Sequence, residues 1–246
     1  MLQQTHLALD GATAKRYAHI GGVLYLIIIV IGLLGESYVR GTLMVSGDAT
    51  ASAQNILESK FLWRAGIAGQ LLLLICALSL THIWYLLLRP VHPHLSLLLV
   101  FFALCSLAVE SISALCLQAV LLPLSGADYL QPFSTQQLHA LSYIAVRLHG
   151  FAFGIALIFF GVECLIVGYL IRKSDYFPKV IGVLMQLAGI AYLINSFCIV
   201  LFPSITQYLF PAILLPAFIG ESTFCLWLLI KGLNVAAWNK HPGVAN

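Results

Sequence analysis

Residues 95–122 read LSLLLVFFALCSLAVESISALCLQAVLL, and this stretch decides the class of fold. Glu110 is its single charged residue, and the run exceeds the roughly 20 apolar residues that an α-helix needs to cross about 30 Å of hydrocarbon. Backbone in hydrocarbon must satisfy its own hydrogen bonds, which only helices and closed barrels achieve. Because the stretch lacks the alternating pattern of a barrel strand, it predicts a transmembrane helix.

Comparable apolar runs recur along the whole chain of 246 residues. Hydrophobic residues make up 61% of the composition and charged residues 9%, against roughly 25% charged in an ordinary soluble domain. Bounded by charged residues and by Pro or Gly, the runs predict transmembrane helices at 17–39, 63–88, 95–122, 139–171, 179–201 and 209–231. We therefore expect an all-α fold, a polytopic integral membrane helix bundle with six transmembrane helices at 17–232, between cytoplasmic tails at 1–16 and 233–246.

The basic residues of the connections predict the orientation of the bundle. One side of the membrane receives Lys15, Arg16, Arg89, Arg172, Lys173, Lys179, Lys231 and Lys240, whereas the other receives Arg40, Lys60 and Arg64. Because cytoplasmic connections have an excess of Lys and Arg, we expect both termini in the cytoplasm and a multi-pass protein of the cell (inner) membrane. On the outer side, residues 49–58 are compatible with a helix that lies along the surface.

Several functional classes have no support in the sequence. A net charge of +3 with scattered Lys and Arg does not form the clustered basic surface of a nucleic-acid-binding protein. The cysteines and histidines show no metal-ligand spacing, and no P-loop, dinucleotide-binding or nucleophile-elbow motif occurs. We expect no nucleic-acid partner, metal or cofactor, and the sequence favours a protein that is not an enzyme. The expected partners are bilayer lipids and a small-molecule or lipid ligand; the oligomeric state is left open.

Ionisable residues inside the predicted spans mark the candidate site, because each costs about 2.5–3.5 kcal/mol at a helix centre. Polar residues concentrate in the outer half of the bundle, with two acids nearer its middle and Glu163 toward the inner side. Asn195 is expected to face the interior together with Tyr192, three residues before it. We predict that a ligand binds in a polar cavity lined by Glu36, Arg64, Glu110, Arg147, His149, Asn195 and Glu221.

Glu36 and Glu110 each have a structural alternative. Glu36 and Arg40 are four residues apart in the favourable order, so they can form an interfacial salt bridge. In the functional interpretation, Glu36 and Arg64 line the mouth of a cavity. Glu110 lies in the middle of its apolar run and cannot reach water easily. Burial disfavours its charged form unless a cation such as Arg147 pairs with it.

Glu221 lies in the last predicted span, five residues after Pro216. A proline removes one backbone donor and clashes with the carbonyl four residues earlier, here Ala212, so we expect a kink. Freed backbone groups beside an intramembrane carboxyl occur at ligand and ion sites of transporters. The structural alternative is a packing kink, with Glu221 bonded to a neighbouring helix.

Five short motifs carry a resemblance to a known family. They are GGVLYL at 21–26, Glu36 with Val39 and Arg40, SGADY at 125–129, GYLI at 168–171, and the closing run from Leu215 to Gly232. The chain resembles a bacterial family of uncharacterised polytopic membrane proteins, domain of unknown function 4386, over roughly residues 17–232. The resemblance implies a single six-helix domain and no particular activity. Glu163 stands where the family pattern more often has histidine.

Three functions remain open on the sequence. The favoured one is binding or transport of a small or lipid-like molecule through the polar cavity, because such sites form between helices. The second is a non-catalytic interaction or sensor protein in which the charges only hold the bundle together. The third, a membrane-embedded enzyme on a lipid-like substrate with Glu110 or Glu221 and His149 as acid and base, ranks lowest because no recognisable catalytic set is present.

Overall fold

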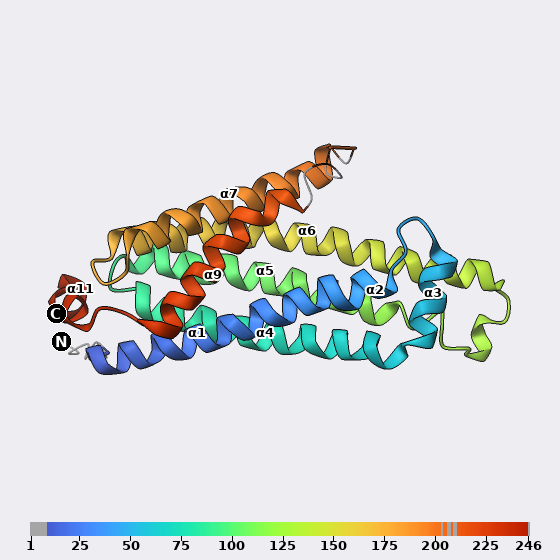
Figure 1. Cartoon of the computed structure of the whole chain (residues 1–246), viewed down its shortest axis with the longest axis horizontal. Coiled ribbons are helices and arrows are strands. Elements are labelled where there is room, and N and C mark those ends of the chain that lie inside the picture. Colours follow the sequence, from blue (N-terminus) through green and yellow to red (C-terminus); the bar gives the residue numbers. More distant parts are fainter. Residues whose placement is uncertain (1–8, 203, 206–207, 209–210, 246) are drawn as a thin grey trace, which may run out of the picture.

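The computed structural model describes residues 9–202, 204–205, 208 and 211–245 (Figure 1). Six of its helices are long and apolar enough to cross a membrane: Gly11–Leu43, Lys60–Leu88, Pro93–Ala119, Thr135–Lys173, Lys179–Leu201 and Ala212–Ile230. Over the described residues every regular element is a helix, so the predicted all-α, six-span membrane fold is confirmed.

Some of these spans are composite. The first consists of α1 (Gly11–Leu33), a π-helical segment η1 (Leu34–Arg40) and α2 (Gly41–Leu43). The last consists of a 3-10 turn η3 (Ala212–Leu214) and α9 (Leu215–Ile230). The middle four are α4 (Lys60–Leu88), α5 (Pro93–Ala119), α6 (Thr135–Lys173) and α7 (Lys179–Leu201). The short elements outside the spans are α3 (Ala49–Glu58), η2 (Asp128–Leu130), α10 (Val235–Lys240) and α11 (Pro242–Ala245).

Successive spans pack side by side and form a ring. Each of α1, α4, α5, α6 and α7 packs on the next span in the chain, and α9 packs back on α1. The start of α1 and the short helix α11, the first and last described elements, lie at the same end of the bundle (Figure 1). We call this end, predicted to be cytoplasmic, the inner end, and the opposite end, which has α3, the outer end.

The first helix begins at Gly11, six residues before the predicted start. The side chain of Asp10 accepts a hydrogen bond of 2.6 Å from the backbone N–H of Thr13 and so caps the helix. At the other terminus Trp238 of α10 is buried, and its indole N–H donates to the carbonyl of Leu9 at 3.0 Å. Residues that the sequence assigned to two tails therefore pack together at the inner end.

Glycines allow α6 and α7 to approach closely. Gly161 and Gly168 of α6 face Gly189 and Gly182 of α7, with backbone against backbone. A Cβ atom at Gly161 would lie 3.0 Å from the carbonyl oxygen of Gly189, which leaves almost no room for a side chain. Small residues at such interfaces are common in membranes, where close packing replaces the hydrophobic effect as the force between helices.

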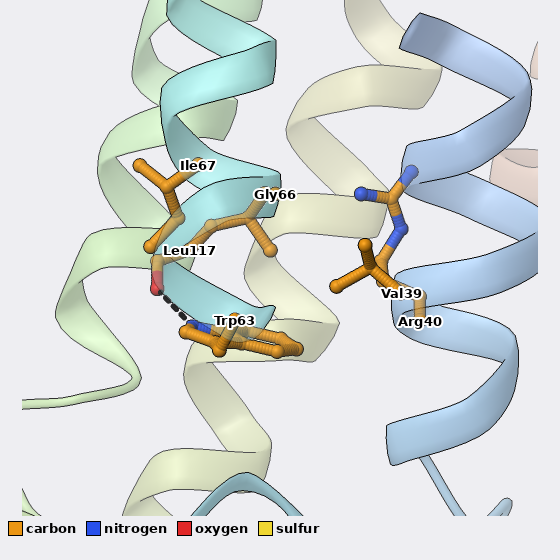
Figure 2. Close-up of a pocket in the computed structure, with 6 residues that line it drawn as sticks. All are labelled: Val39, Arg40, Trp63, Gly66, Ile67 and Leu117. Carbon is orange, nitrogen blue, oxygen red and sulfur yellow. Dashed lines mark hydrogen bonds between the residues drawn. The ribbon is translucent and has the colours of Figure 1, made fainter. Parts of the chain in front are cut away.

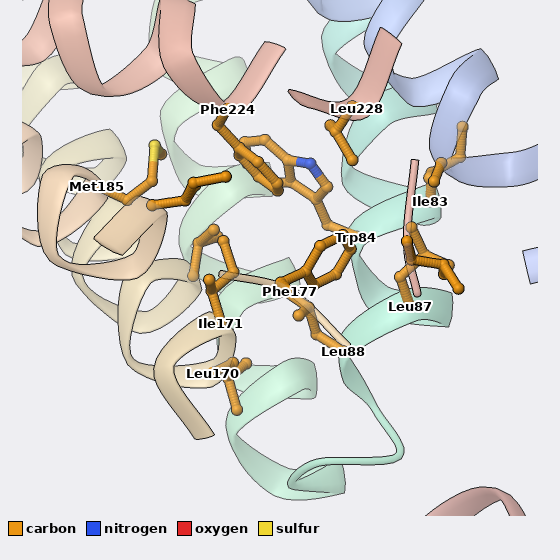
Figure 3. Close-up of a cluster of buried hydrophobic side chains, with 14 of the residues drawn as sticks. Ile83, Trp84, Leu87, Leu88, Leu170, Ile171, Phe177, Met185, Phe224 and Leu228 are labelled. Carbon is orange, nitrogen blue, oxygen red and sulfur yellow. The ribbon is translucent and has the colours of Figure 1, made fainter. Parts of the chain in front are cut away.

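Two apolar clusters fill the interior. The larger lies toward the inner end, where Trp84, Phe177, Phe224 and Leu228 are among its members (Figure 3). The smaller lies at the outer end and includes Ile56 of α3. The helix at Ala49–Glu58 therefore matches the predicted surface helix, and it covers the outer end of the bundle.

Candidate functional site

The outer end of the first span holds the predicted ion pair. Nε of Arg40 donates to the Glu36 carboxylate at 2.9 Å; the Arg40 side chain is 16% exposed and that of Glu36 55%. Both residues lie in η1, and π-helical turns within α-helices often occur at functional sites. Beside Arg40 is a cavity of about 10 Å³, enough for roughly one water molecule, whose lining is completed by Val39, Trp63, Gly66, Ile67 and Leu117 (Figure 2).

One step further into the bundle, α5 and α6 are joined by His149 and Ser113. The Ser113 hydroxyl lies 2.6 Å from Nδ1 of His149 and donates to its carbonyl oxygen at 3.0 Å. His149 is buried, its ring stacks on Phe153, and it lies within electrostatic reach of Glu36 and Arg40. The predicted residues Glu36 and His149 therefore belong to one neighbourhood.

The next polar contact joins α4 to α5. The side-chain amide of Gln70 donates to the Glu110 carboxyl at 2.7 Å, and Gln70 is buried. Ser106, on the same face of α5, donates instead to the carbonyl of Ala156 on α6 at 3.0 Å. Glu110 is therefore held by an uncharged partner, and Arg147, considered above as a possible counterion, is exposed.

Near the middle of the bundle, α7 and α9 are joined by Tyr192 and Glu221. The Tyr192 hydroxyl donates to Oε1 of Glu221, which is 8% exposed. Pro216 lies in the first turn of α9, directly after η3, where a missing backbone N–H costs no helical hydrogen bond. The chain therefore starts a new helix at this point, where the sequence predicted a kink inside a continuous one.

Glu163 of α6 is a third buried acid inside the bundle. It is 3% exposed and lies within electrostatic reach of both Glu110 and Glu221. Among the described residues the one salt bridge is Arg40–Glu36, so none of these three acids is paired with a base. We define the hydrogen-bonded pairs together with Glu163 as the polar row: Glu36, Arg40, Ser113, His149, Gln70, Glu110, Glu163, Tyr192 and Glu221.

The other predicted site residues lie outside this row. Arg64 and Arg147 are exposed, and the guanidinium of Arg147 lies 5.6 Å from the ring centre of Phe151. Asn195 is buried one helical turn from Tyr192, and its Oδ1 has no hydrogen-bond partner among the described residues. Sequence reasoning left Glu163 out of the site, although its position inside a span was a sufficient signal.

A groove on the lipid-facing side of the bundle lies near the broken last span. It has a volume of about 300 Å³ and is lined entirely by apolar residues, namely Leu184, Leu187, Ala212, Leu215, Pro216 and Ile219. The groove is separated from the polar row by close packing, because Gly220 of α9 lies against the backbone of Leu184 on α7. The two features are therefore distinct.

The fold and the polar row together define a multi-pass helical membrane protein with uncompensated acids in its interior. Comparison with known proteins identifies its family: the chain matches the domain of unknown function DUF4386 over residues 20–232 and belongs to that family. It is similar to an uncharacterised protein of Archaeoglobus fulgidus, with 28% identity over 166 residues, which are 68% of this chain and 83% of that protein. No solved structure matches the chain. The family resemblance of the sequence motifs is therefore confirmed.

Proposed function

We propose that this protein binds or transports a small or lipid-like molecule, which enters from the outer end and reaches Glu110 and Glu221. The observation that supports this most is the polar row, whose separate hydrogen-bonded pairs occur in η1 and between the helices α4, α5, α6, α7 and α9. Polar and ionisable groups inside a membrane are expensive, and they commonly mark the path of a substrate or ion.

The partners of the acids support a binding role over a purely structural one. A buried ion pair within the protein would satisfy each charge, but Glu110 is bonded to the amide of Gln70 and Glu221 to the hydroxyl of Tyr192, both of which are uncharged. Such neutral partners leave each carboxyl free to interact with a positive or hydrogen-bonding group of a ligand. Glu36, His149 and Asn195 would line the approach to the two acids, and Arg64 and Arg147 would attract or select ligands at the outer surface.

The small volume of the cavity beside Arg40, about 10 Å³, favours a second candidate. In this alternative the protein is a non-catalytic interaction or sensor protein, and its polar row serves only to join the helices. Ser106 already joins α5 to α6 through the carbonyl oxygen of Ala156 without any ionisable partner. A structural role predicts that apolar replacement of Gln70 and Glu110 together leaves function intact.

The two candidates are separated by mass spectrometry of the lipids and metabolites that copurify with the protein. The native chain is compared with the double variant Glu110→Gln, Glu221→Gln, and with Glu58→Gln as control, because Glu58 is an exposed acid of α3. Binding predicts one species that is retained by the native chain and by Glu58→Gln and lost from the double variant. The same generic lipids in all three preparations contradict it.

A further inference from the structure

Glu221 lies where α1, α7 and α9 meet. Its carboxyl accepts a hydrogen bond from Tyr192, and the hydroxyl of Tyr25 lies beside it, within electrostatic reach. Tyr25 is 2% exposed, and its hydroxyl has no hydrogen bond of standard geometry to any described residue. Because buried polar groups are normally paired, this hydroxyl gives the site spare hydrogen-bonding capacity beside the acid.

The groups that surround this acid supply no positive charge. Glu221 and the nearby Glu163 have titratable neighbours on five helices of the ring. These neighbours are Tyr25 on α1, Glu110 on α5, Cys164 on α6, Tyr192 on α7 and Cys225 on α9. An ionised carboxylate here lacks a counterion among the described residues, and an unpaired buried charge costs several kcal/mol. The site therefore requires either a proton on the carboxyl or a cation from outside the protein.

Aromatic side chains pack around the two tyrosines beside Glu221 and favour an organic cation. The ring of Tyr25 lies edge-on to Trp84 and Phe224 at centroid distances of 5.6 and 6.2 Å, and Tyr192 lies 5.3 Å from Phe160. Aromatic faces together with a carboxylate bind amines and quaternary ammonium groups. Metal ions need a set of several ligands, and no group of three His, Cys, Asp or Glu residues suited to a metal occurs in the described part of the chain.

The same aromatic residues close the inner end. Trp84 stacks on Phe224 at 6.0 Å, Phe224 meets Phe177 at 5.9 Å, and Phe177 meets Tyr176 at 5.2 Å (Figure 3). Beyond Tyr176 lies the buried Trp238. The polar row continues from Glu221 toward the outer end, where Arg40 and Glu36 stand. A cation bound at Glu221 would then exchange with the outer side, because aromatic side chains fill the inner end.

We propose that Glu221, between Tyr25 and Tyr192, is one site shared by a proton and a lipophilic organic cation, each of which displaces the other. When the cation binds, the carboxyl O–H bond breaks, the proton leaves to the outer solution, and the carboxylate pairs with the cation. The Tyr192 hydroxyl then gives up its place beside Glu221. This inference rests on the proposed function, because it names the class of molecule that the polar row would bind.

Binding of tetraphenylphosphonium and of benzyltrimethylammonium to the purified full-length protein tests the proposal. Titration calorimetry at several pH values gives the affinity, and a pH indicator in weak buffer gives the protons released. We expect about one proton released per cation, and an affinity that falls by about tenfold per pH unit once the carboxyl is protonated, as one competing proton requires. Affinity without pH dependence, or no binding of either probe, overturns the proposal.

Four variants locate the site. Glu221→Gln should weaken binding by about 30-fold or more, the usual effect of removing one partner of a buried charge pair, whereas Glu58→Gln should bind like the native chain. Tyr25→Phe keeps the aromatic face and should keep binding, and Tyr25→Leu should weaken it by about 2- to 30-fold. If Glu221→Gln does not fold, proton release by the native protein still decides. Equal binding by Glu221→Gln and the native chain overturns the proposal.

The two proposals fail in different ways. If a specific uncharged species copurifies with the native chain and neither probe binds, the shared cation and proton site is wrong while the proposed function stands. If no species copurifies specifically and neither probe binds, both are wrong.

Discussion

Replacement of Gly168 by alanine tests the close packing of α6 on α7. A Cβ atom at this position would overlap the carbonyl oxygen of Gly182 and would lie 2.9 Å from the backbone nitrogen of Gln186. Both are backbone atoms, so no side chain can rotate away and the helices must separate. Overpacking of this kind costs typically about 1–3 kcal/mol, and the better helix propensity of alanine returns at most about 1 kcal/mol.

We therefore expect Gly168→Ala to lower the free energy of unfolding by about 1–2 kcal/mol. Gly150, also in α6, is the matched control, since a Cβ atom there meets no heavy atom within 4 Å among the described residues. Gly150→Ala should leave stability unchanged or raise it by up to about 1 kcal/mol. Reversible unfolding in sodium dodecyl sulfate, followed by tryptophan fluorescence, gives both values. Equal stability of the two variants would refute the backbone-to-backbone packing described for α6 and α7.

Three further predictions concern the ends of the helices and their connections. Ser134→Ala should cost about 1 kcal/mol of stability in the same unfolding assay, because it removes the capping box of α6; unchanged stability would mean that this helix end contributes nothing. Hydrogen bonds from Thr13 hold the pKa of Asp10 below its ordinary value of 3.8, so the cap should be present above that pH and lost as the pH falls through the lowered pKa. Amide exchange in the first turn of α1 reports this, and Asp10→Asn should remove the pH dependence. Burial raises the pKa of Tyr176, so its hydroxyl keeps its proton between pH 6 and 9 and donates to the carbonyl of Leu87 at 2.7 Å. Tyr176→Phe should therefore cost about 1 kcal/mol in the unfolding assay at any pH in this range. A loss of stability confined to high pH would contradict this.

The number and rough limits of the spans were predictable because bilayer thickness fixes the length of an apolar helix. The run at 179–201 coincides with α7, and the run at 49–58 coincides with α3. The start of α1 was missed because its first turns, from Gly11 to Arg16, are polar at the surface and are stabilised by the Asp10 cap and by contact with the C-terminal segment. Such contacts between distant segments have no signature in a hydropathy pattern.

The candidate site was predictable in kind and only partly in detail. Glu110 and Glu221 were recognisable because a carboxyl inside an apolar run is costly wherever it points. Their partners, Gln70 and Tyr192, are ordinary helical residues whose role depends on how the helices are rotated within the ring. Tyr25 could not be singled out for the same reason, since only the packing of α1 against α9 brings its hydroxyl beside the acid.

The proposed function requires that the acids inside the bundle are open to a ligand, instead of being fixed in ion pairs. Dicyclohexylcarbodiimide, which enters bilayers and reacts with protonated carboxyls, tests this directly when the modified peptides are identified by mass spectrometry in membranes. We predict modification of Glu110 or Glu221 that slows when the copurifying ligand is added, with Glu36 unmodified because it is a carboxylate paired with Arg40. Absence of modification at both Glu110 and Glu221 would contradict the proposed function.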